Sequence, residues 1–229
     1  MKRIVIFSAI AVWTLVAAAN QCPGQKPNEK PNDASRASPA LSVVHELYVE
    51  DQKDRHAEHR DASYWKGVNT RDAARRDAVK ELIANQRVIS GEDFYDAAVI
   101  YQHGRSAGDY LLAHILAMES MAKGYSQSKA IAAASLDRYL VMIKQSQVFG
   151  TQYLAVPPPA TKAGGAAPPP TALDESATTQ EPYDRLLVPD ALRREFCVPN
   201  LKQQAANLAA FNASRDPEDS DLVPVGCTR

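Results

Sequence analysis

The residues best suited to chemistry in this sequence are a histidine and its amide neighbour, Gln102 and His103, at the end of a predicted helix. Histidine titrates near neutral pH and is the side chain that most often acts as a general acid or base. Gly104 ends the helix directly after it, so His103 lies beside a loop at a helix C-terminus, where the dipole favours the protonated imidazole. Both side chains are candidates to face a cleft. The alternative is that they cap the last carbonyl groups of the helix.

A second candidate pair lies in a helix predicted over residues 41–61. The buried stripe of that helix contains Val44 and Leu47 and, continued at about 100° per residue, reaches Asp51 and Arg55. Asp51 and Arg55 are one helical turn apart and can form an ion pair. Because an unpaired buried charge is very costly, either the helix has left the core here or the pair borders a polar cavity. In the second interpretation the opposite wall includes Gln102, His103 or His114.

The third candidate block, residues 147–152, follows a long predicted helix. Gly150 turns the chain, and Thr151 and Gln152 then present two hydrogen-bonding side chains. The block is therefore a candidate cleft wall, or only a turn. His114, in contrast, lies inside the apolar stripe of its own helix, which is typical of a core histidine with a satisfied hydrogen bond.

Two further patterns do not support a metal or nucleophile site. His56 and His59 are close enough to share a helix face, but their spacing differs from the His-Glu-x-x-His pattern of zinc proteases. The cysteines match no zinc pattern, and the sequence contains no phosphate-binding loop or nucleophile elbow. We therefore predict no metal ligands and no cofactor.

The elements that position these blocks are predicted to be helices. The segment Ser90-Gly91-Glu92-Asp93 has the form of a capping box and starts the helix that ends at Gly104. A helix from about residue 70, with its basic residues outside, is predicted to follow a loop at residues 64–67. The helix over residues 128–146 is apolar almost all round and is predicted to be the buried centre. We expect an all-α fold, a single domain of five to six helices.

The start of the chain predicts export. Lys2-Arg3, an apolar run and Ala17-Ala18-Ala19 have the layout of a signal peptide over residues 1–19, with an uncleaved anchor as the alternative. Lipidation at Cys22 is disfavoured, because Asn20 and Gln21 precede it instead of small residues. The location is therefore predicted to be periplasmic or secreted, with no stable membrane span after cleavage. The formal net charge of −1 falls to −3 once Lys2 and Arg3 are removed, which does not suit nucleic-acid binding.

Composition divides the rest of the chain. Residues 20–39 are rich in Pro, Asn and Lys and are predicted to be a flexible tether, followed by a helical core over 40–154. Residues 155–182 contain two triple prolines and a Gly/Ala-rich segment, which predicts a loop that packs as neither helix nor strand. Residues 183–212 are a helical region of the same domain, broken at Pro199, and 213–229 are a polar tail. In an exported protein Cys197 and Cys227 are candidates for a disulfide, although three cysteines allow other pairings.

Three blocks together resemble a bacterial family described only as domain of unknown function 6624. They are Glu46-Leu47…Asp51-Gln52…Arg55, the run Ala97–His103, and Gln147–Gln152; the later Asp190–Arg194 also fits. Gly104 departs from the Ala-Asp that tends to follow the histidine in that family. The resemblance implies a mostly helical fold and no known activity. It singles out the same candidate binding residues: Asp51, Gln52, Arg55, Gln102, His103, Thr151 and Gln152.

Two functions are compatible with these features. The first is an exported helical binding or inhibitory module of the cell envelope, including an immunity-type protein, whose partner is a protein or a small molecule. The second is a small hydrolase or lyase in which His103 is the general base and Asp51 or Arg55 orients it or holds an anionic group. The two are separated by whether the three blocks converge in space.

Overall fold

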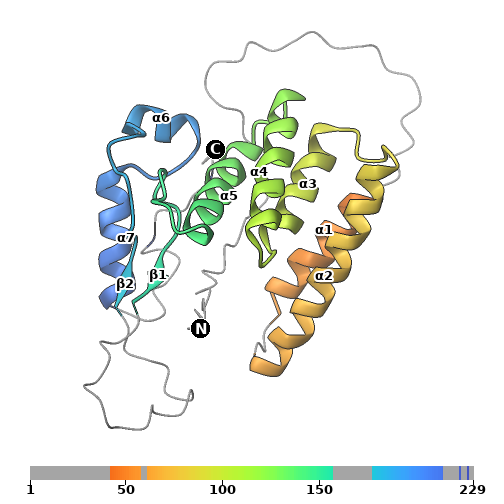
Figure 1. The fold of residues 1–229 in the computed structure, drawn as a ribbon, viewed down its shortest axis with the longest axis horizontal. Helices are drawn as coiled ribbons and strands as arrows, with labels where there is room; N and C mark the ends of the chain where they lie inside the picture. Colours follow the sequence, from red (N-terminus) through yellow and green to blue (C-terminus); the bar gives the residue numbers. More distant parts are fainter. Residues whose placement is uncertain (1–41, 58–60, 157–176, 214–221, 223–225, 227–229) are drawn as a thin grey trace.

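The computed structural model describes residues 42–57, 61–156 and 177–213, together with Leu222 and Gly226 (Figure 1). Within these residues it contains seven helices and a pair of two-residue strands, so the predicted all-α fold is confirmed. The elements are α1 Val43–Arg55, α2 Ala62–Ala84, α3 Gly91–Gln102, α4 Ala107–Ala122, α5 Ser128–Met142, β1 Leu154–Ala155, β2 Thr178–Thr179, α6 Asp190–Glu195 and α7 Leu201–Ala213.

The first five helices lie side by side and form the body of the fold (Figure 1). The most extensive packing joins α3 to α4 and α4 to α5, while α1 and α2 pack on α3 from the other side. Helices α6 and α7 and the small sheet lie beyond α5. Helix α1, which carries Asp51 and Arg55, and α5, which precedes the third candidate block, therefore both pack on α3.

Helix starts follow the sequence closely where a capping residue is present. The capping box at Ser90 and Asp93 forms as predicted, and a second one forms at Ser106 and Asp109 at the start of α4. Gly104 lies between α3 and α4, and a Cβ there would overlap the Asp109 side chain. Gly104 is thus required for the tight connection that places the end of α3 against the start of α4.

The buried centre is α3, and the prediction that residues 128–146 form it is wrong. Every residue of α3 from Tyr95 to Gln102 is buried, whereas Tyr139–Met142 at the end of α5 are only half-buried. The reason is position: α3 has α1 and α2 on one side and α4 and α5 on the other. Apolar composition all round a helix therefore did not identify the most enclosed one.

The prediction for α2 also needs correction. Residues 64–67 are helical and do not form a loop, because Asp61 caps the helix by accepting a hydrogen bond from the Tyr64 amide at 2.7 Å. The basic residues of this helix are not all outside. Arg75 and Asp72 are each 5% exposed, because they face charged groups on α1.

The segment 155–182 is predicted to contain neither helix nor strand. This prediction is wrong at both ends of the segment, where short strands pair. Leu154 pairs with Thr179 in an antiparallel register, and the Val156 amide donates to the Ala177 carbonyl at 2.7 Å. Residues 157–176 lie outside the described residues. The chain therefore leaves and re-enters the fold at one point.

The C-terminal region is broken as predicted, with α6 and α7 separated around Pro199. The buried residues of α7 are Gln204 and Asn207. Cys197 is disulfide-bonded, and the Gly226 amide donates to its carbonyl at 2.7 Å. Cys22 and Cys227 lie outside the described residues, so the Cys197–Cys227 pairing stays a prediction.

Several terminal predictions fall outside the described residues, namely the signal segment 1–19, the tether 20–39 and nearly all of the tail 213–229. His59 is outside them as well. Across the part of the chain that the structure describes, no helix is both long and apolar enough to cross a membrane.

Candidate functional site

A fully buried carboxylate, Asp51 on α1, is the centre of the candidate site. Its side chain is 0% exposed. The Nδ1 atom of His103, at the C-terminus of α3, lies 3.0 Å from Oδ2, and the Gln52 amide donates to the same oxygen at 2.9 Å. Arg55 Nη1 lies 3.1 Å from Oδ1. The interpretation in which Asp51 and Arg55 border a polar site opposite His103 is thus the one that the structure contains.

Charged residues of α2 surround the Asp51 carboxylate on its other side. Asp72 binds Arg55 Nη2 at 2.9 Å and Arg75 Nη1 at 2.7 Å, and Arg75 lies 3.7 Å from Asp51. Arg75 and Arg71 both contact the Asp54 carboxylate. We call this set the charge network; its members are Asp51, Asp54, Arg55, Arg71, Asp72, Arg75 and His103.

A residue that the sequence analysis did not select, Arg138 on α5, connects the other two candidate blocks. Its Nη1 donates to the Gln102 carbonyl at 2.8 Å, and its Nε donates to Gln152 Oε1 at 3.0 Å. The guanidinium also lies 5.9 Å from the centre of the Tyr110 ring. Arg138 therefore ties the end of α3 to the segment after α5.

That segment is held by a second set of buried polar side chains, which we call the loop network: Asp137, Gln147, Thr151 and Gln180. Asp137 accepts hydrogen bonds from the amides of Val148, Phe149 and Thr151 at 2.8–3.0 Å and from the Thr151 hydroxyl at 2.8 Å. Its contacts fix the turn in which Gly150 has a φ of +79°. Thr151 is therefore a turn residue that reaches the candidate site only through Gln152, whose amide donates to it at 2.9 Å.

The structure brings four of the seven predicted residues into direct contact and connects the other three to them only indirectly. Asp51, Gln52, Arg55 and His103 meet directly, and Gln102, Thr151 and Gln152 join them through Arg138 and the peptide bond between Gln102 and His103. The His103 imidazole binds a carboxylate and does not cap its own helix. Their role in binding stays a prediction. His114 is apart from the site, since its Nδ1 donates to the Ala132 carbonyl at 2.9 Å.

The protonation states follow from burial and charge. Burial is the largest influence on the pKa of His103 and lowers it; Asp51 opposes this shift, Arg55 and Arg138 add to it, and the net pKa is below the ordinary value. The helix dipole therefore does not decide the charge of His103. Burial raises the pKa of Asp51, but His103, Arg55 and Arg75 together outweigh it and lower the pKa. The stable state is a carboxylate beside a neutral imidazole, with Nδ1–H donating and Nε2 left as the base.

Within the described residues, one polar group near the site has no hydrogen-bond partner and one charged group has no counter-charge. Gln102 is 8% exposed, and its Oε1 is buried with no hydrogen-bond partner. Burial lowers the pKa of Arg138, which contacts no carboxylate in the described part of the chain. Buried polar groups are normally paired, so such exceptions mark places where a ligand can supply the partner.

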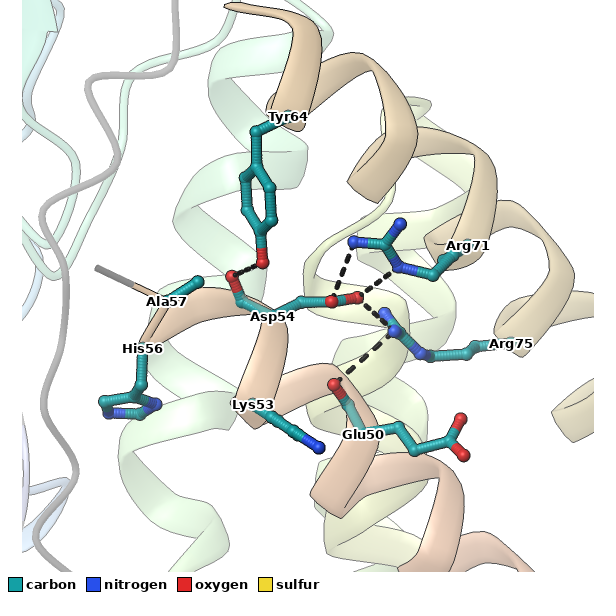
Figure 2. Close-up of a pocket in the computed structure, with 8 residues that line it drawn as sticks. All are labelled: Glu50, Lys53, Asp54, His56, Ala57, Tyr64, Arg71 and Arg75. Atoms are coloured by element: carbon teal, nitrogen blue, oxygen red, sulfur yellow. Dashed lines mark hydrogen bonds and ion pairs between the residues drawn. The ribbon is translucent and has the colours of Figure 1, made fainter. Parts of the chain in front are cut away.

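An open pocket of about 640 Å³ adjoins the charge network on α1 and α2 (Figure 2). Asp54 lies at its centre, where Arg71 and Arg75 bind the carboxylate and the Tyr64 hydroxyl donates to the backbone carbonyl at 2.8 Å. His103 does not line this pocket. Its two arginines are already paired with Asp54, and Lys53 is a further basic residue in its lining. We place the candidate site at His103, because an imidazole bound to a buried carboxylate can act as a base there.

The sequence held usable signals for the residues that were missed. Asp137 and Arg138 are adjacent charges inside an otherwise apolar helix, which indicates buried, partnered groups. Asp72 and Arg75 on α2 looked like part of a solvated face. No group of three or more His, Cys, Asp or Glu in the described ranges is arranged to hold a metal ion.

Comparisons with protein-family models, with curated proteins and with solved structures gave no match to this chain. The resemblance to domain of unknown function 6624 therefore stays a prediction.

Proposed function

We propose that this is an exported helical protein that binds a small molecule at the His103 site and acts on it as a hydrolase or lyase, with His103 as the general base. The observation that supports this most is the His103–Asp51 pair at 3.0 Å, in which the carboxylate is 0% exposed and the imidazole 22% exposed. An ionised, buried carboxylate fixes the imidazole tautomer and stabilises the imidazolium when a proton arrives. The proposal requires that the exposed part of the side chain include Nε2, which the substrate must reach.

In the proposed reaction Nε2 takes a proton from a bound water, whose oxygen attacks the substrate, or from a substrate carbon. The leaving group departs with the bonding electrons of the broken bond, and the imidazolium returns the proton to it. Asp51 acts through the imidazole and is a positioning residue. Arg55 holds the carboxylate at 3.1 Å and keeps it ionised.

A second candidate function is a binding or inhibitory module, including an immunity-type protein that blocks a toxin. The surface of α4 favours it, because Leu111, Ile115 and Met118 are 36%, 53% and 48% exposed and lie on one face of the helix. In that case the His103 cluster contributes to stability only, and the partner is a protein.

A thermal-shift screen of small anionic and neutral metabolites against residues 20–229 tests the proposal. A ligand that binds the native state raises the melting temperature by mass action. We expect His103→Ala to leave the unliganded melting temperature nearly unchanged, to reduce the ligand shift and to abolish turnover of the bound ligand, and Asp51→Asn to lower turnover by about 10²-fold or more. A large loss of unliganded stability in His103→Ala, with the ligand shift retained by the folded fraction, would assign His103 to the scaffold.

A further inference from the structure

The acidic and basic side chains of α1 and α2 neutralise one another. Three carboxylates face three guanidinium groups, and each guanidinium has at least one carboxylate oxygen within 3.1 Å. The pairs are Arg55 with Asp51, Arg71 with Asp54 and Arg75 with Asp72. This set carries no surplus positive charge that would attract an anion.

Arg138 on α5 differs from those arginines. Its Nε and Nη1 bind two neutral acceptors, Gln152 Oε1 and the Gln102 carbonyl, and its Nη2 makes no hydrogen bond with any described residue. Arg138 is half-buried, and partly removing a guanidinium from water without a counter-charge is unfavourable. The lowered pKa of Arg138 has the same physical origin. The side chain is thus held in a fixed position with its charge uncompensated.

The unpaired charge of Arg138 acts on the proposed base. Its positive charge contributes to the lowered pKa of His103, as does that of Arg55, and Arg55 acts on Arg138 as well. His103 therefore lies within the electrostatic range of two guanidinium groups from opposite elements, α1 and α5. The Oε1 atom of Gln102, the residue before His103, is buried and has no hydrogen-bond partner among the described residues.

We infer that Arg138 binds the anionic group of the substrate, and that the substrate class is a small carboxylate or phosphate. This inference rests on the proposed function of the His103 site. A guanidinium donates planar, parallel N–H bonds that suit both kinds of oxyanion. A bound anion also compensates the charge that otherwise disfavours protonation of His103, so substrate binding makes the base stronger.

The inference is tested with residues 20–229 carrying isotope-labelled histidine, titrated by NMR with sodium acetate and, separately, with sodium phosphate. Sodium chloride keeps the ionic strength constant. We expect a saturable change in the His103 imidazole signals and a rise in its pKa with at least one of the two anions; which anion binds distinguishes a carboxylate from a phosphate ligand. Arg138→Gln is expected to weaken binding about 10-fold or more and Arg138→Lys less, because a charge remains.

The matched control is Arg87→Gln, an exposed arginine after α2, which should bind as the wild type does. Equal affinity in Arg138→Gln and wild type, or shifts that chloride reproduces, would overturn the inference. If Arg138→Gln does not fold, Arg138→Lys with unchanged affinity and an unchanged His103 pKa also overturns it. His103→Gln, followed by calorimetry, should keep the anion affinity within about 3-fold. Anion binding that persists there, without any turnover by wild type, would leave the Arg138 site standing and remove the general-base function.

Discussion

The charge network and the loop network are both buried and polar, and Gln152, Arg138 and the Gln102 backbone link them, yet they differ in what their side chains bind. In the loop network Asp137 and Gln147 bind backbone amides and carbonyls and fix a turn. In the charge network side chains bind other side chains, and the set ends at a partly exposed imidazole. Burial of polar groups alone therefore does not identify a site. An accessible base beside an unpaired charge distinguishes the His103 region from a purely structural network.

The largest effect is expected from Asp137→Ala. The change leaves the amides of Val148, Phe149 and Thr151 without their acceptor in a buried position, so we expect unfolding to become easier by about 3–5 kcal/mol. Urea unfolding followed by circular dichroism measures this. Asp77→Ala, an exposed carboxylate on α2, is the control and should change stability by less than about 0.5 kcal/mol. A small effect at Asp137 would mean that the turn keeps its shape without the carboxylate.

Gln147→Ala should have the next largest effect. Gln147 is 0% exposed; its amide donates to the Gln180 and Gln152 carbonyls, and its oxygen accepts from the Gln152 amide at 2.9 Å. We expect a loss of about 2–3 kcal/mol in the free energy of unfolding. Because Gln152 also positions Arg138, phosphate or acetate affinity should fall as well. Wild-type anion affinity in a destabilised Gln147→Ala protein would separate the two networks completely.

The pH dependence of stability is expected to report on His103. Asp51 and Arg55 from α1, Arg76 from α2 and Arg138 from α5 face this residue. Because its folded pKa is below the ordinary 6.5, the unfolded chain binds more protons than the native state between those two values. The contribution of His103 to stability is therefore present above pH 6.5 and is lost as the pH falls toward the folded pKa.

The measurement compares wild type with His103→Gln, which lacks this titration. The difference in their free energies of unfolding should fall as the pH is lowered from about 7.5 to 5. Asp51 titrates below this window, because its pKa is lowered from 3.8. A difference that instead grows toward pH 5 would mean that the Asp51 carboxylate raises the pKa of the imidazole, against the assignment of a neutral His103.

The smallest effect is expected from Arg71→Ala at the outer edge of the charge network. The Arg71 side chain is 46% exposed, and its pair with Asp54 at 2.8 Å is open to solvent. Exposed ion pairs contribute about 0–1 kcal/mol, so thermal unfolding should change little, and anion binding at His103 should not change. A loss of anion binding would place the ligand in the pocket on α1 and α2 instead.

Much of the candidate site was predictable, because the buried face of a helix can be extrapolated over several turns from the regular rotation of about 100° per residue. The stripe through Val44 led to Asp51, and the capping box at Ser90 and the glycine at 104 set the end of α3 at His103. Arg138 was not predictable in this way, since apolar residues occur all round α5 and leave its buried face undefined. Arg75 was misplaced because a charge usually indicates solvent, and only the three-dimensional arrangement supplies its carboxylate partners.

The short β1–β2 ladder makes the fold tolerant to changes in chain length at one place. The Val156 amide donates a hydrogen bond to the Ala177 carbonyl at 2.7 Å, so residues 156 and 177 are held next to each other. The segment between them therefore begins and ends at the same place on the fold. Doubling the length of a flexible connection there costs only about 0.6 kcal/mol in closure entropy. A reporter domain or an affinity handle spliced between those residues should therefore leave the helical body intact, which gives an internal attachment point away from both chain ends.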